Sequence, residues 1–199
     1  MVSRHNASRA VVIGASAGGV GALMKVLGAL PADFPLPLAM VLHLRPDAGN
    51  FLADILNRHT PLQVRQAEEK EHPRPGVAYL APPNYHLLIE EDRSLALNVD
   101  ERVNFARPSV DVLFDSAAHA FGPALIGVVL TGANADGARG AARIKAAGGM
   151  VVVQDPAEAE ASAMPAAALA ATTPDRVLTL AEIAPLLMEL ATRGRRRRS

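Results

Sequence analysis

The chain has 199 residues, of which 50% are apolar and 4% aromatic, and its formal net charge is 0. This length suits one domain with an aliphatic core, and the neutral charge gives no overall field that would attract nucleic acid. The absence of cysteine excludes disulfides and thiol catalysis and fits a cytoplasmic protein. No apolar run reaches the length of about 20 residues that a membrane-spanning helix needs, so we expect no membrane insertion.

Short apolar runs alternate with segments of helical spacing along the chain. The runs predict buried strands at Ala10 to Ala15, Leu38 to Leu44, Ala124 to Leu130 and Met150 to Val153, and an edge strand at Arg176 to Leu180. The other segments predict helices after Gly19, at Asn50 to Arg58, after Ser109, at Ala138 to Ala147, within Ala157 to Ala171 and at Leu180 to Thr192. This alternation predicts a doubly wound three-layer α/β sandwich with a mainly parallel sheet.

Residues 76–99 interrupt this alternation. Short extended pieces there are separated by turn residues, which predicts a β-hairpin inserted in the α/β frame. His86 lies in this hairpin, and we expect it to have a structural role. We expect a single domain at residues 9–192, flanked by an N-terminal arm at residues 1–8 and a solvated basic tail at residues 193–199.

A turn of small residues follows the first strand, and one serine, Ser16, stands at its apex between Gly14 and Gly19. Three interpretations fit this turn. It can present Ser16 as a nucleophile, it can cradle the phosphates of a dinucleotide, or it can simply let a helix pack closely on a strand. In the first interpretation, the N–H of Ala17 points into the same space, near the positive end of the following helix.

Candidate catalytic side chains also follow two further strands. His43 ends the second strand, and Asp136 follows the third, close to the start of a helix. Because ligands bind outside the carboxyl ends of parallel strands, Ser16, His43 and Asp136 should converge on one edge of the sheet. A serine nucleophile needs an imidazole that accepts its proton and a carboxylate that orients the imidazole. The structural alternatives are a packed histidine at a strand end and an aspartate that caps its own helix.

The same residues weaken the dinucleotide interpretation. Ser16 takes the place of the second glycine, where the backbone must approach a pyrophosphate, and no acidic residue for a ribose ends the second strand. Only Arg45, which could meet a 2′-phosphate, keeps this interpretation open. The histidines are scattered without a metal-ligand spacing, so we expect neither a metal nor a cofactor.

Several motifs occur in order along the chain: Val12 to Gly19, Val41 to Leu44, Tyr79 to Pro83, Arg107 to Phe114 and Leu130 to Ala138. Together they resemble the catalytic domain of the bacterial chemotaxis protein-glutamate methylesterases. The resemblance implies hydrolysis of glutamate γ-methyl esters on the cytoplasmic helices of methyl-accepting chemoreceptors, with release of methanol. Some members also deamidate receptor glutamines. The resemblance implies Ser16 as the nucleophile, His43 as the base and Asp136 as the orienting acid.

A serine hydrolase needs an oxyanion hole, and this chain departs from the family pattern at the positions expected to form it. We expect the donors to be the N–H of Ala17 and a backbone N–H from the loop that contains Ala133 and Asn134. Family members often carry threonine at the position of Ala17, and methionine and glycine at those of Ala133 and Asn134. We therefore expect a pocket of different shape at this loop.

The typical family member also carries an N-terminal receiver domain, whereas the first strand here begins close to Met1. We therefore expect a stand-alone catalytic domain that is constitutive, regulated in trans or devoted to a different signalling array. Its expected partners are methylated chemoreceptors and a cognate methyltransferase or trans-acting regulator, without nucleic acid. A non-catalytic docking module of the same fold and a nucleotide-binding protein are the alternatives.

Overall fold

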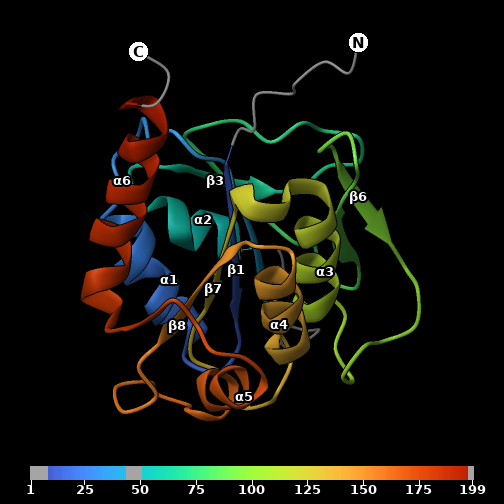
Figure 1. Ribbon diagram of the computed structural model, residues 1–199. Helices are drawn as coiled ribbons and strands as arrows, with labels where there is room; N and C mark the ends of the chain where they lie inside the picture. The colour runs from blue at the N-terminus through green and yellow to red at the C-terminus, as the bar shows by residue number, and fades with distance from the viewer. Residues whose placement is uncertain (1–8, 44–50, 197–199) are drawn as a thin grey trace.

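The computed structural model describes residues 9–43 and 51–196, with side chains up to residue 192 (Figure 1). The N-terminal arm expected at residues 1–8, Arg45 and the last residues of the basic tail lie outside the described residues. The strands, helices and candidate site below all belong to the described ranges.

A seven-stranded sheet runs through the centre of the molecule, and every neighbouring pair of its strands is parallel. From one edge to the other, the strands are β3 (Gln63–Gln66), β4 (Val77–Leu80), β2 (Leu38–Leu42), β1 (Ala10–Ala15), β7 (Leu125–Val129), β8 (Met150–Gln154) and β9 (Arg176–Leu178). The central strands β1, β2 and β7 are buried along their whole length, which explains their uninterrupted apolar sequences.

Helices cover both faces of this sheet (Figure 1). One face carries α1 (Gly19–Gly28), α2 (Leu52–Asn57) and α6 (Leu180–Arg196), and the other carries α3 (Val110–Phe121), α4 (Ala138–Ala146) and α5 (Ala163–Ala171). Successive strand residues point to opposite faces, so Val11 and Ile13 pack in the first core and Val12 packs in the second. The predicted doubly wound three-layer sandwich is confirmed.

The predicted hairpin forms, but it occupies only part of the region expected for it. β5 (His86–Ile89) and β6 (Leu95–Asn98) pair antiparallel in a separate sheet, and Leu87 and Leu95 pack in the same core as α3. The piece before them, β4, instead pairs parallel with β2 in the main sheet. All the residues of β4 are buried, as expected for a strand that is covered on both faces.

The last helix differs from the sequence prediction, whereas the alanine-rich segment before it agrees with it. Helix α6 continues beyond Thr192 through Arg196, so the first residues of the predicted tail are helical. The alanine-rich segment forms one helix, α5, within the predicted range, and this helix starts at Ala163. Asp155 delays this start, because its carboxylate accepts the N–H of Ala157 (2.9 Å) and its carbonyl accepts that of Glu158 (3.1 Å).

The order of the strands creates a switch point at the centre of the sheet. The chain leaves β1 for β2 on one side and later adds β7 on the other side of β1. Such a switch leaves a crevice outside the carboxyl ends of the strands, where open α/β sheets bind ligands. The segments that follow β1, β2 and β7 carry Ser16, His43 and Asp136, so all three lie at this edge.

Candidate active site

Ser16 lies in the middle of the carboxyl edge and is held there by its backbone. Its N–H donates to the carbonyl of Thr131 (2.9 Å), and the N–H of His43 donates to the carbonyl of Ala15 (3.0 Å). These hydrogen bonds continue the parallel pairing beyond the strands on both sides of β1. The structure therefore brings Ser16 and His43 together at the edge where the strand order placed them.

Glycines shape the turn that carries Ser16. Gly18, directly before α1, has a φ of 75°, a left-handed conformation that glycine adopts without steric cost. A Cβ atom on Gly14 would lie 2.2 Å from Cγ1 of Val110, so the start of α3 packs directly on β1. Close packing and the presentation of Ser16 are thus both served by the same turn.

A buried carboxylate orients the imidazole of His43. Nε2 of His43 lies 2.8 Å from Oδ2 of Asp136, whose side chain has an exposed fraction of 0%. Asp136 also accepts hydrogen bonds from the backbone N–H groups of Val110 (2.7 Å) and Asp111 (3.1 Å). These contacts fix the carboxylate between the end of β7 and the start of α3.

Two further side chains complete the surroundings of Asp136. The hydroxyl of Ser109 and the amide of Asn104 each donate to its Oδ1 over 2.8 Å. Burial has the largest single influence on the pKa of Asp136 and raises it, but the hydrogen bonds, led by that of His43, together lower the pKa below its usual value. The carboxylate is therefore ionised at neutral pH, the state that stabilises an imidazolium.

The helix caps near Asp136 differ from those that the sequence suggested. The N-cap position of α4 is Gly137, and the carboxylate of Asp136 accepts N–H groups of α3 instead of its own helix. Ser109 stands at the N-cap of α3 as expected, but its hydroxyl donates to Asp136 and makes no cap bond. A charged carboxylate is the stronger acceptor for the α3 N–H groups, which leaves the Ser109 hydroxyl free to act as a donor.

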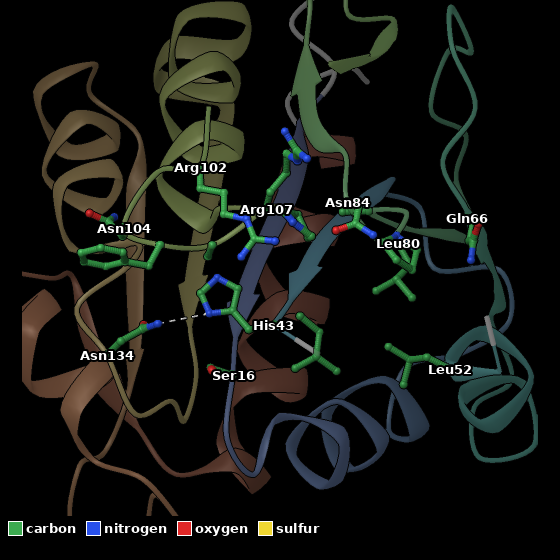
Figure 2. A pocket seen from close by; sticks show the side chains of 16 residues that line it. Ser16, His43, Leu52, Gln66, Leu80, Asn84, Arg102, Asn104, Arg107 and Asn134 are labelled. Atoms are coloured by element: carbon green, nitrogen blue, oxygen red, sulfur yellow. Dashed lines mark hydrogen bonds between the residues drawn. The ribbon is translucent and has the colours of Figure 1, made fainter. Parts of the chain in front are cut away.

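Asn134 forms hydrogen bonds with both His43 and Asp136. Its Oδ1 accepts the N–H of Asp136 (3.2 Å), and its Nδ2 lies 3.3 Å from Nδ1 of His43 (Figure 2). Because Nε2 of His43 faces a carboxylate, the ring proton belongs on Nε2, and Nδ1 presents a lone pair to the amide of Asn134. The lone pair that would accept a proton from Ser16 is thus hydrogen-bonded to Asn134 in the free protein.

The backbone around Ser16 offers donors for an oxyanion. The N–H groups of Ala17, Ala133 and Asn134 have no acceptor within the part of the chain that the structure describes. Gly132, in contrast, donates its N–H to the carbonyl of Ala161 (2.9 Å) and is not available. In the loop expected to supply the second donor, the N–H groups of Ala133 and Asn134 are thus unpaired among the described residues.

A cavity of about 320 Å³ opens over these groups. Ser16, His43 and Asn134 lie at one end of it, and Arg102 and Arg107 come from the loop between β6 and α3 (Figure 2). The hydroxyl of Ser16 has no hydrogen-bond partner among the described residues, and no bond joins it to His43 in this state. The cavity is large enough for an ester side chain and a neighbouring group.

The loop between β6 and α3 supplies Asn104, a residue of the site that the sequence did not reveal. Val103 and Ala106 exchange two backbone hydrogen bonds across a tight turn, and Asn104 and Phe105 at its tip have φ values of 52° and 62°. This turn aims the amide of Asn104 at Asp136. Such turns usually contain a glycine, which marks them in a sequence. This turn has no glycine, so Asn104 was its only sequence signal, and a weak one.

His86 is buried and fully hydrogen-bonded. Its Nδ1 accepts the N–H of Ser109 (3.2 Å), and its Nε2 faces the carbonyl of Glu101 (3.0 Å), away from the cavity. This placement agrees with the structural role expected for it. Within the described ranges, no group of three or more histidine, aspartate or glutamate side chains is placed to hold a metal ion.

No helix of the described chain is both long enough and apolar enough to cross a membrane.

The fold and site together define an α/β protein with a candidate serine-hydrolase centre at the switch point of its sheet. The family model for CheB methylesterase matches residues 11–187, and the chain belongs to the CheB methylesterase family. The catalytic domain of Thermotoga maritima CheB methylesterase superimposes with a TM-score of 0.88 at 34% identity, and the match covers 92% of this chain and 98% of that domain.

Two relatives define the similarity further. A Leptospira interrogans protein provisionally named protein-glutamate methylesterase/protein-glutamine glutaminase is 48% identical over 181 residues, which cover 91% of this chain and 94% of that protein. The protein-glutamate methylesterase FrzG of Myxococcus xanthus is 38% identical over 179 residues, which cover 90% of this chain and 54% of FrzG. The resemblance seen in the sequence motifs is therefore confirmed.

Proposed function

We propose that this chain hydrolyses glutamate γ-methyl esters on the cytoplasmic helices of chemoreceptors and releases methanol. The observation that carries the proposal is the hydrogen bond between His43 and Asp136 beside Ser16, at the carboxyl edge of a CheB methylesterase fold. The names of both relatives support an esterase for methylated protein glutamates, and that of the Leptospira interrogans protein adds protein glutamines. The proposal places the enzyme in the cytoplasm, where these receptor helices lie.

In the proposed first step, the hydroxyl of Ser16 attacks the ester carbonyl while Nδ1 of His43 takes its proton. The amide of Asn134 must first leave the lone pair that it contacts at 3.3 Å. The ionised Asp136 then stabilises the imidazolium through the bond at Nε2. Ser16 and His43 are held by the backbone contacts described above, and both line the same cavity.

The negative charge that develops on the carbonyl oxygen needs fixed donors. We propose the N–H of Ala17, at the positive end of α1, and the N–H of Ala133 or Asn134 for this role. Methanol leaves with the proton from His43, and water then hydrolyses the acyl-enzyme by the same route. Deamidation of a glutamine follows the same steps with ammonia as the leaving group.

Methanol release from receptors that are methylated on glutamate tests this proposal. The native chain should release methanol, and Ser16→Ala should lower the rate by about 10,000-fold or more. The matched control is Ser162→Ala, because Ser162 is exposed and its side chain makes no cap bond. This control should keep the native rate, and both variants should keep the native melting temperature.

Two results would contradict the proposal. Release that persists in Ser16→Ala would remove the serine from the reaction. Binding of the receptor without release by the native chain would favour a non-catalytic docking module. A cognate methyltransferase or a trans-acting regulator stays a proposed partner, which copurification with the native chain can test.

A further inference from the structure

Two positive charges without carboxylate partners border the cavity that contains Ser16 and His43. Arg102 and Arg107 line it, and none of the described lining residues is an aspartate or a glutamate (Figure 2). Neither arginine forms an ion pair within the described part of the chain. The described residues thus give the entrance to the reacting groups a positive charge.

Arg107 is held in place without a counter-charge. Its Nη1 donates to the carbonyls of Val99 (2.7 Å) and Asp100 (2.9 Å), while its Nε is buried and has no partner among the described residues. A guanidinium that is partly removed from water and unpaired is costly, and an anion in the cavity would compensate it. The carboxylate of Asp100 does not provide this compensating charge, because it accepts a hydrogen bond from the amide of Asn98 and lies outside the cavity lining.

Arg102 adds a second positive charge, which is exposed. Its side chain is exposed and has no hydrogen-bond or ionic partner in the described ranges. Figure 2 shows the guanidinium of Arg102 above His43, while that of Arg107 points to the carbonyls of Val99 and Asp100. The planar guanidinium can donate two parallel hydrogen bonds to a carboxylate, which makes arginines suitable donors for an acidic side chain.

We propose that Arg102 and Arg107 form a subsite for a carboxylate that the substrate carries within about one helical turn of the ester. This inference rests on the proposed function and narrows its substrate class to acidic peptide segments. A ligand that reaches Ser16 occupies the cavity that both arginines line, so a neighbouring acidic side chain meets them at the moment of binding. The subsite selects the substrate, while the reacting groups remain Ser16 and His43.

A pair of matched helical peptides tests the subsite. Both carry one glutamate γ-methyl ester, and they differ only in whether glutamate or glutamine stands within one turn of it. The native chain should favour the acidic peptide by about tenfold or more in kcat/KM, mainly through KM, and added salt should reduce this preference. Arg102→Gln should lower the preference to about threefold or less.

Arg102 is the better position to change, because it has no bond to another described residue, whereas Arg107 also holds the loop. Arg143→Gln is the matched control: Arg143 is an exposed arginine of α4 outside the cavity lining, and its variant removes the same charge. The control should keep the full preference. Equal kcat/KM for the two peptides in the native chain, or an unchanged preference in Arg102→Gln, would overturn the subsite.

A binding measurement separates the subsite from the proposed function. Ser16→Ala should bind the acidic peptide about tenfold more tightly than the neutral one, and the double variant Ser16→Ala/Arg102→Gln should bind both alike. This binding preference is measured independently of whether methanol is released. Loss of hydrolysis with the binding preference intact would contradict the esterase alone, and hydrolysis without any binding preference would contradict the subsite alone.

Discussion

Asp111 and Asp136 cap each other's helices. Asp136, just before α4, accepts the N–H groups of Val110 and Asp111 at the start of α3, over 2.7 and 3.1 Å. Asp111 returns the contact, since its Oδ1 accepts the N–H groups of Gly137 (3.0 Å) and Gly140 (2.7 Å) at the start of α4. Two helices that are far apart in sequence are thereby fixed to each other at the point where the candidate catalytic acid stands.

This exchange predicts the effect of changing Asp111, which does not line the cavity. Asp111→Ala should lower the free energy of unfolding by about 2–3 kcal/mol, because it leaves buried N–H groups of α4 without an acceptor. Asp111→Asn keeps an acceptor oxygen and should cost less. Urea unfolding measures both variants.

The activity of the Asp111 variants gives a second readout. Both should hydrolyse the ester more slowly than the native chain, because the segment that carries Asp136 loses its anchor. A variant that loses stability but keeps the native rate would show that the position of Asp136 does not depend on the capping exchange.

The lowered pKa of Asp136 predicts how stability changes with acid. The folded chain keeps this carboxylate ionised to a lower pH than the unfolded chain, in which the pKa is about 3.9. The unfolded state therefore binds more protons in the window between the two values. The stabilisation by Asp136 is fully present above the unfolded pKa and is lost as the pH falls through the folded pKa.

Asp136→Asn isolates this contribution. At pH 7, the variant should be less stable than the native chain by about 2–4 kcal/mol, and the difference should shrink below about pH 4. Burial raises the pKa of Asp175, but its bonds to Lys145 and Val151 outweigh burial and lower the pKa overall. Asp175 is present in both proteins, so its titration cancels in the difference between them. Urea unfolding between pH 7 and pH 3 measures the difference, and a constant difference over that range would refute the assignment.

The contact between Asn134 and His43 predicts a variant with a faster nucleophile. Asn134→Ala keeps the backbone N–H but removes the amide that occupies Nδ1 of His43. Ser16 should then react about fivefold faster with a small phosphonate that labels active serines, since one competing hydrogen bond is gone. Asn134→Asp should react more slowly than the native chain. Its carboxylate would accept a hydrogen bond from an N–H at Nδ1 of His43, and it would thereby favour the protonated imidazole, which cannot act as a base.

Labelling of Ser16 that is slower by about tenfold or more in Asn134→Ala would contradict this prediction. The side-chain amide would then belong to the oxyanion hole or would be needed to orient His43. Ser162→Ala again serves as the control variant, since it leaves the cavity unchanged.

The sequence contained enough to place the strands and the three candidate catalytic residues. Buried parallel strands are continuous apolar runs, and Ser16, His43 and Asp136 each follow such a run, so one rule about strand ends brings them together. The main error in the sheet was at β4, which was read together with the hairpin. Its four residues do not distinguish a central strand from a hairpin strand, because both are short and apolar.

The surroundings of Asp136 were beyond what the sequence could reveal. Asn104 reaches it from a left-handed turn without a marker residue, and Ser109 uses its hydroxyl across the site instead of along its own helix. The bond from Gly132 to Ala161 likewise depends on a loop more than twenty positions away along the chain. Such contacts follow from the packing of separate segments, which no local pattern records.

Phe105 predicts a trade between stability and substrate binding. It has a φ of 62°, which is strained for a bulky residue, and its side chain is 96% exposed although it lines the mouth of the cavity. Phe105→Gly should therefore raise the free energy of unfolding by about 0.5–1 kcal/mol, whereas Phe105→Ala, which keeps the strain, should leave it nearly unchanged.

An exposed ring in a strained position is explained if it packs against the bound substrate. Both Phe105 variants should then lower kcat/KM for the methylated receptor several-fold, with little change in the phosphonate labelling of Ser16. Urea unfolding and methanol release measure the two effects separately. If Phe105→Gly were less stable than the native chain, the ring would contribute to the fold itself, and an unchanged kcat/KM in both variants would remove Phe105 from the substrate-binding surface.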